Sequence, residues 1–150
     1  AGLSVVLPFL PLIGGGKTRF QPVYVGDIAQ AVLACLNSSD TMGKIYELGG
    51  PEVLSFKEIY TKLFEQTGRK KLLLPLPWVV AKLNGAVLGL LPCPILTADQ
   101  VESLKTDSVV GSGAQTLESL GITATPMSTI LPAYLARYRP GGRFGAKKRA

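Results

Sequence analysis

The sequence has 150 residues, of which 47% are hydrophobic and 17% charged, so its apolar content suffices for the core of one domain. It contains no histidine, and its two cysteines, Cys35 and Cys93, lack a metal-ligand spacing, so we expect neither a metal centre nor a Ser–His or Cys–His catalytic pair. No charged stretch followed by an apolar stretch and a cleavage site opens the chain, so we expect no signal peptide and two reduced thiols.

The net charge of +6 is concentrated at one end of the chain. Residues 137–150 carry six basic side chains and no acidic one, whereas the rest of the sequence carries ten of each. The basic character is therefore a property of a tail. Such tails commonly confer solubility or are disordered, and less often they contact anionic lipid, nucleic acid or an acidic partner.

The first 20 residues are apolar but interrupted by prolines and by the triple glycine 14–16, which predicts a loop with a short helical turn. The run Gly-Gly-Gly-Lys-Thr has a partial likeness to a phosphate-binding loop. Pro11 occupies the position where that motif needs its first glycine, so we interpret the run as a turn or hinge.

Residues 21–36 predict a strand followed by a helix. The run 22–25 has strand composition, and Asp27 stands where a helix N-cap would accept hydrogen bonds from free amides. The apolar positions of this helix recur at helical spacing, at Ile28, Ala31, Val32, Cys35 and Leu36.

A second strand is expected over residues 44–48, whose side chains alternate as in a strand, and residues 49–51 end it.

Two capping boxes mark the starts of two further helices. Ser55 with Glu58, and Thr97 with Gln100, have the spacing that lets side chain and backbone satisfy each other at a helix N-terminus. The first of these helices is expected to end at Gly68, and the second to continue through residue 104 and end near residue 107.

Shorter elements complete the expected fold. Residues 71–74 predict a buried strand, and residues 114–120 predict a short helix stopped by Gly121. Residues 78–91 form an apolar helix that is too short to span a membrane, which takes ~20 residues; we expect it to pack in the core, with a membrane-surface helix as the alternative. A last helix begins with Pro126 at its first position, and its inward residues are Met127, Ile130, Leu131, Tyr134, Leu135 and Tyr138.

The residue identities of one segment are more specific than its strand–helix pattern. Residues 22–31, Pro-Val-Tyr-Val-Gly-Asp-Ile-Ala-Gln-Ala, resemble the V-x-V-x-D-(V/I)-A-x-A segment of the extended and atypical short-chain dehydrogenase/reductase family, epimerase-like proteins that bind NAD(P). Residues 44–58, 96–122 and 131–144 extend the likeness, which covers about residues 7–145. Together they resemble the nucleotide-binding, epimerase-like accessory subunits of respiratory complex I and its bacterial relatives.

The resemblance implies NADP or NAD in the intact protein, held by a nucleotide-binding half that would precede this chain. No Gly-x-Gly-x-x-Gly run and no Tyr-x-x-x-Lys occur, so we expect this chain alone to bind no cofactor and to hold no catalytic residue. Phe20 occupies the position of an arginine that contacts substrate phosphate in sugar-nucleotide epimerases, and Arg19 lies one place away. Arg19, Gln21 and Tyr24 are thus candidate substrate-pocket residues, with a structural strand edge as the alternative.

The resemblance also implies a fold. We expect an α/β chain that forms the C-terminal, substrate-domain part of an epimerase-like Rossmann protein, with short strands and several helices and without the nucleotide-binding half. Residues 1–20 would be a loop or hinge remnant of the preceding core, residues 21–138 the substrate-domain region, and residues 139–150 a flexible basic tail.

The function implied is that of a structural accessory subunit of NADH:quinone oxidoreductase. One alternative is the substrate domain of a stand-alone NAD(P)H-dependent reductase or sugar-nucleotide epimerase, and another is a lipid- or anion-binding module. Expected partners are the nucleotide-binding half, complex I subunits and an anionic membrane surface reached by residues 137–150, but no nucleic acid. The expected location is peripheral, on the cytoplasmic side of the bacterial inner membrane or on the mitochondrial matrix side.

Overall fold

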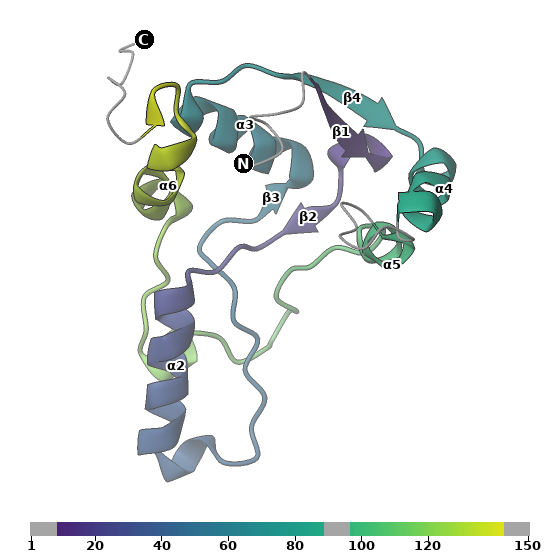
Figure 1. The fold of residues 1–150 in the computed structure, drawn as a ribbon. Helices are drawn as coiled ribbons and strands as arrows, with labels where there is room; N and C mark the ends of the chain where they lie inside the picture. Colours follow the sequence, from purple (N-terminus) through teal and green to yellow (C-terminus); the bar gives the residue numbers. More distant parts are fainter. Residues whose placement is uncertain (1–8, 89–96, 143–150) are drawn as a thin grey trace.

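The computed structural model describes residues 9–88 and 97–142, which form an α/β fold with short strands and several helices (Figure 1). The strands pair as two separate two-stranded sheets, β1 with β4 and β2 with β3. The main elements are β1 (Phe9–Ile13), β2 (Arg19–Phe20), α2 (Val25–Asn37), β3 (Leu54–Ser55), α3 (Phe56–Thr67), β4 (Leu72–Leu76), α4 (Trp78–Leu88), α5 (Ala98–Ser103) and α6 (Met127–Leu135). Four short 3-10 turns connect them, at Gly14–Gly16, Ser39–Thr41, Glu118–Leu120 and Ala136–Tyr138.

The loop predicted within residues 1–20 is wrong for residues 9–13, because β1 pairs in parallel with β4, from Phe9 beside Leu72 to Ile13 beside Leu76. The predicted short helical turn is present at Gly14–Gly16, and residues 1–8 lie outside the described residues. Prolines are compatible with both strands, since each strand of a two-stranded sheet has an open edge that needs no N–H donor. The strand predicted over residues 71–74 is present as β4, which runs from residue 72 through Pro75 to residue 76. The prediction that it is buried is wrong, because Leu72 and Leu74 are exposed.

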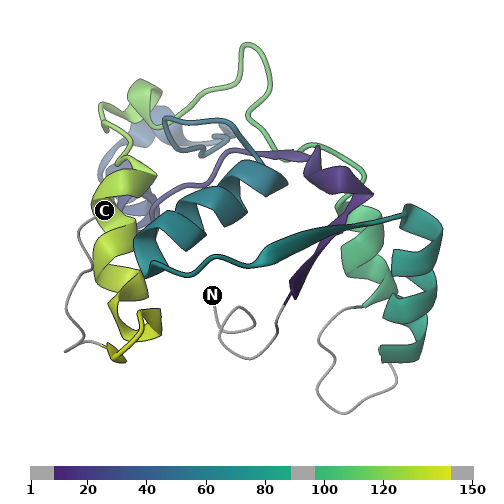
Figure 2. The same ribbon diagram turned by 90° about the horizontal axis from the view of Figure 1, so that it is seen from above.

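The core lies between this sheet and the helices α4 and α5, which lie side by side (Figure 2). Ile13, Ala81 and Val101 are buried there. Gly14 follows β1 because nothing larger fits: a methyl group at its Cα would lie 2.0 Å from the ring of Trp78. Leu76, Trp78 and Leu104 pack around this cluster. Only part of α4 joins the core, because Val79 and Leu83 are exposed.

The helix α2 begins three residues earlier than predicted, and Asp27 is not its N-cap. The N-cap is Tyr24, which makes no side-chain capping bond, and residues 22–25 form no strand. Asp27 lies in the first turn, is only 2% exposed, and accepts hydrogen bonds from the backbone N–H and the hydroxyl of Thr125, at 2.7 and 2.8 Å. These two hydrogen bonds satisfy the Asp27 side chain in a buried position, where a polar group without partners would be costly.

Residues 44–48, predicted as a strand, form a single bridge, between Tyr46 and Gln115. A strand needs a continuous partner, and in the described chain only this one pair is available to it. Ile45 and the preceding Met42 are exposed. The helix α2 and this segment extend away from the other helices at the lower end of Figure 1.

Both predicted capping boxes are confirmed, at Ser55 for α3 and at Thr97 for α5. The helix α3 ends at Gly68, which adopts the left-handed conformation expected of a C-cap, with φ of 66°. The helix α5 ends at Ser103, earlier than predicted. Only a 3-10 turn, Glu118–Leu120, forms in the predicted helix over residues 114–120, and Gly121 ends it as expected.

The last helix, α6, packs beside α3. Pro126 is its N-cap and not its first residue, and Tyr134, predicted to face inward, is 56% exposed. The Arg139 side chain, at the start of the predicted tail, donates to the Gln66 carbonyl oxygen at 3.0 Å. The rest of that tail from residue 143, residues 89–91 of the predicted apolar helix, and Leu96 lie outside the described residues.

Candidate functional site

A cavity of about 590 Å³ opens between β1, β2, the first half of α3 and α5. Side chains from both sheets and both helices form its wall, which is predominantly apolar. Its lining residues are Pro11, Ile13, Phe20, Phe56, Tyr60, Asp99, Gln100, Ser103, Leu104 and Ser108. A concave apolar site with a few polar groups is the usual form of a small-molecule pocket, and this volume lies in the usual range.

An aromatic cluster forms one wall of the cavity. The ring centroids of Phe20 and Phe56 lie 6.0 Å apart, and those of Phe56 and Tyr60 lie 4.7 Å apart. Phe64 continues the row behind Tyr60, with its ring stacked at 6.2 Å. Three of these rings come from α3 at intervals of four residues, which places them on one helix face. Burial raises the pKa of the Tyr60 hydroxyl, so this group stays protonated and uncharged at neutral pH.

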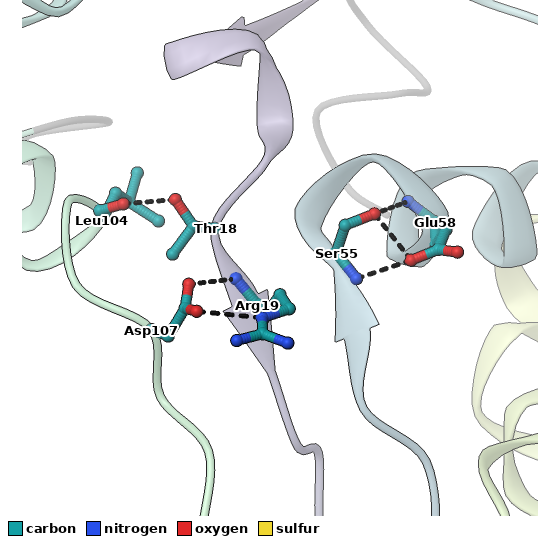
Figure 3. Close-up of polar contacts among 6 residues, drawn as sticks. All are labelled: Thr18, Arg19, Ser55, Glu58, Leu104 and Asp107. Atoms are coloured by element: carbon teal, nitrogen blue, oxygen red, sulfur yellow. Dashed lines mark hydrogen bonds and ion pairs between the residues drawn. The ribbon is translucent and has the colours of Figure 1, made fainter.

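The capping box of α3 fixes where this wall begins (Figure 3). The Glu58 backbone N–H donates to Ser55 Oγ at 3.2 Å, and the Ser55 N–H and hydroxyl both donate to Glu58 Oε2 at 2.7 Å. The hydrogen bond from the Ser55 side chain is the main reason why the pKa of Glu58 is lowered. The helix therefore starts at Phe56, whose ring reaches the cavity.

Thr18 joins the two sides of the cavity. Its carbonyl oxygen accepts from the Phe56 N–H at 2.9 Å, and its hydroxyl donates to the Leu104 carbonyl oxygen (Figure 3). Thr18 is buried, although it is a polar residue, because both of these groups are satisfied. The two walls are thus held by hydrogen bonds through one residue of the strand region.

The opposite wall belongs to α5. Thr97 and Gln100 form its capping box, with bonds of 3.1 and 3.2 Å, and Ser103 donates to the Asp99 carbonyl oxygen at 2.9 Å. Val101 anchors the helix in the core. The polar residues Asp99, Gln100 and Ser103 consequently face the aromatic wall across the cavity.

Of the three predicted pocket residues, Arg19 is paired with Asp107. Its backbone N–H and its Nε donate to the two carboxylate oxygens at 2.8 and 2.9 Å (Figure 3). These bonds, first the one from the backbone, lower the pKa of Asp107. Both side chains are substantially exposed, so this pair adds little to stability. Its place is beside the cavity wall and not in it.

The Gln21 side chain links two segments that are distant in sequence. Its side-chain amide donates to the Gly50 carbonyl oxygen at 2.8 Å and accepts from the Val110 N–H at 3.0 Å. Tyr24 lies elsewhere, in an apolar cavity of about 350 Å³ between the start of α2 and α6. The three residues are not brought together around one cavity, and their role as substrate-pocket residues remains a prediction.

The residues that do line the main cavity were not predicted as site residues. One signal for them was present, because Phe56, Tyr60 and Phe64 recur every four residues, but core packing explains such spacing equally well. The contribution of Phe20 and of α5 depends on contacts between distant segments. In the described residues no group of three or more His, Cys, Asp or Glu side chains could hold a metal ion.

The glycines 14–16 do not fit a dinucleotide. They form a 3-10 turn after β1, and no helix follows whose N-terminus could face a pyrophosphate. Trp78 lies against Gly14, and a side chain at Gly16 would meet Leu12 at 2.5 Å, so Gly14 and Gly16 serve close packing. No step of cofactor chemistry is assigned to the described residues.

No protein-family model matches the chain, but it is similar to mitochondrial complex I subunits. It is 36% identical over 149 residues to NADH dehydrogenase (ubiquinone) 1 alpha subcomplex subunit 9 of Arabidopsis thaliana, and 32% identical over 132 residues to the subunit of that name from Rattus norvegicus. These matches cover 92% and 87% of this chain but only 37% and 35% of the relatives. The resemblance predicted from the sequence is thereby confirmed.

The fold has a counterpart among solved structures. The triphenylmethane reductase of a Citrobacter species, in a structure complexed with NADP(H), matches with a TM-score of 0.65 and 23% sequence identity. The match covers 88% of this chain and 47% of the reductase. The chain thus corresponds to about half of a reductase of this architecture and spans little more than a third of its complex I relatives.

Proposed function

We propose that this chain is the substrate-domain portion of an accessory subunit of respiratory complex I, NADH:quinone oxidoreductase, and that its role there is structural. The observation that carries the proposal is the 36% identity to the Arabidopsis complex I subunit across 92% of the chain. The absence of a Tyr-x-x-x-Lys from the sequence fits a role without hydride transfer by these residues.

The proposal assigns the nucleotide to another part of the protein. Gly14 and Gly16 of this chain lie in close packing contacts, whereas the reductase of similar fold was crystallised with NADP(H) and is about twice as long as the matched region. A preceding nucleotide-binding half would hold NADP or NAD there. In this organisation residues 1–20 lead out of that half, residues 21–138 form the substrate-domain region, and residues 139–150 form the basic tail.

The exposed apolar face of α2 supports this organisation. Val32, Leu33 and Leu36 are exposed on this helix, and Met42 and Ile45 extend the apolar surface beyond it. Isolated exposed apolar residues are common, but a group on one helix and its adjoining segment is typical of a covered surface. We assign this face to contact with the remaining part of the protein.

The test is assembly of the full-length protein that contains this chain. An affinity tag on that protein should copurify the core subunits of complex I, and the released nucleotide should be NADP or NAD at about one per subunit. A matched preparation carrying Leu36→Lys should still express the protein but should copurify less of the core subunits. Purification as a free protein that reduces added substrates with NAD(P)H would instead support the stand-alone reductase.

Residues 137–150 suggest how the subunit meets the membrane. No helix in residues 9–88 and 97–142 is long and apolar enough to cross one. We assign the protein a peripheral place, on the matrix side in mitochondria or the cytoplasmic side in bacteria, with the basic residues near anionic lipid, each worth ~1 kcal/mol at low salt. Deleting residues 143–150 should therefore reduce binding to phosphatidylglycerol vesicles at low salt but not at high salt, whereas equal binding at every salt concentration would refute this assignment.

A further inference from the structure

We propose that the cavity between β1, β2, α3 and α5 binds an uncharged aromatic molecule. This inference goes beyond the proposed accessory role, because it concerns a binding site on this chain itself. The cavity, about 590 Å³, lies within the range that encloses small organic ligands, and its wall is mainly apolar.

The aromatic wall favours a ring-containing ligand. Phe20, Phe56 and Tyr60 present three rings in tilted contact, with centroid separations of 6.0 and 4.7 Å. Tilted rings leave faces and edges available, and a further ring that packs against them gains aromatic contacts beyond its buried area. An aliphatic ligand of equal size would gain only the burial.

The charges around the cavity disfavour an anion. Arg19 is neutralised by Asp107 at 2.9 Å, and Lys105 and Lys82 both pair with Glu102, at 2.8 and 3.7 Å. The wall itself includes no lysine or arginine. A phosphate or sulfonate placed here would lose water without gaining a cation, which is costly.

The remaining ionisable groups of the wall point the same way. Asp99 is acidic and would repel an anion, and Tyr60 stays neutral because burial raises its pKa. Gln100 Oε1 accepts from the Thr97 N–H and the Ser103 hydroxyl donates to the Asp99 carbonyl oxygen, and both side chains are uncharged. The chemical class that fits all of these groups is therefore an aromatic compound without charge.

A matched pair of fluorescent probes tests the proposal on the full-length protein that contains this chain. N-phenyl-1-naphthylamine and its 8-sulfonate share one ring system and differ by a single negative charge. In the Ser103→Trp variant the indole side chain should fill the cavity. The part of each probe's fluorescence enhancement that is lost in this variant is the signal from this site. Ser103 is exposed, so this variant should keep the fold, and an unchanged melting temperature verifies that it does.

We expect the neutral probe to bind this site at least about tenfold more tightly than the sulfonate, because the anion finds no cation in the wall. Phe20→Lys should reverse the preference by adding a cation to the wall. The control Ser128→Ala, at an exposed position of α6 outside the cavity wall, should change neither probe. Equal affinity of the two probes, or neutral-probe binding that survives Ser103→Trp, would overturn the proposal.

Discussion

The helices α3 and α2 are almost equal in length, 12 and 13 residues, yet they are held in the structure by different means. The helix α3 starts at a complete capping box, ends at a left-handed glycine and places its apolar side chains against α6 and the cavity. The helix α2 has no side-chain N-cap bond, and only Asp27 and Ala31 are buried along it. Local signals define α3, whereas α2 is tied to a distant segment through Asp27 and leaves an apolar face exposed.

The largest expected effect on stability comes from Asp27, through which α2 contacts a distant segment of the chain. Asp27→Ala leaves the Thr125 N–H and hydroxyl without their acceptor in a buried position, and we expect the free energy of unfolding to fall by about 3 kcal/mol. Urea denaturation of the 150-residue chain measures this. Asp27→Asn, which keeps one acceptor, should lose less than Asp27→Ala. A loss below about 0.5 kcal/mol, the usual limit for surface changes, would place Asp27 outside the packed interior.

The next largest effect concerns the caps. Ser55→Ala and Thr97→Ala should each lower the free energy of unfolding by ~1 kcal/mol, the usual value for a lost N-cap. Tyr24→Ala serves as the contrast, because α2 has no side-chain capping bond to lose. Unchanged denaturation midpoints in both capping variants would mean that the boxes do not stabilise their helices.

The two capping boxes differ in pH dependence, which sharpens the account of α3. The Ser55 hydrogen bonds hold the pKa of Glu58 below its ordinary value of 4.5. A carboxyl group with a lowered folded-state pKa stabilises the fold above its unfolded pKa, and this contribution is lost as the pH falls through the folded pKa. The effect of Ser55→Ala should therefore shrink as the pH is lowered from about 6 to about 3.

The box at Thr97 provides the control, because its partner Gln100 does not titrate. The effect of Thr97→Ala should stay constant over the same pH range. Urea midpoints at a series of pH values measure both. Parallel pH profiles for the two variants would show that Glu58 contributes to its box without its charge.

The sequence separation between contacting residues explains how much of the structure could be predicted from the sequence. The box at Ser55 closes within four residues, so the sequence alone suffices to predict it and the glycine that ends α3. The sheet of β1 with β4 joins Phe9 to Leu72, and the partner of Asp27 lies 98 residues away. Composition around Asp27 could indicate a helix start, but it could not indicate that Thr125 would occupy both carboxylate oxygens.

The candidate site shows the same limit. The four-residue spacing of the α3 aromatics was visible in the sequence, whereas Phe20 and α5 reach the cavity only through the tertiary fold. Arg19 and Gln21, both predicted as pocket residues, are neighbours in sequence, but hydrogen bonds to Asp107 and to Gly50 hold their side chains in separate contacts. Residues 44–48 carry a strand pattern, but among the described residues only Tyr46 pairs, in a single bridge with Gln115.

The smallest effect on this chain, and the sharpest use of the comparison, comes from one substitution made on both helices. Leu36→Lys changes an exposed position of α2, so in the 150-residue chain we expect a change within about 0.5 kcal/mol. Leu63→Lys changes a half-buried position of α3 and should lower the free energy of unfolding several times more.

In the full-length protein that contains this chain, Leu36→Lys should become destabilising as well, because the proposed nucleotide-binding half would cover α2. Thermal melts of both lengths measure the difference. An equal loss at the two positions in the short chain would mean that α2 is already packed, and a neutral Leu36→Lys in the full-length protein would mean that its apolar face meets no other part of that protein.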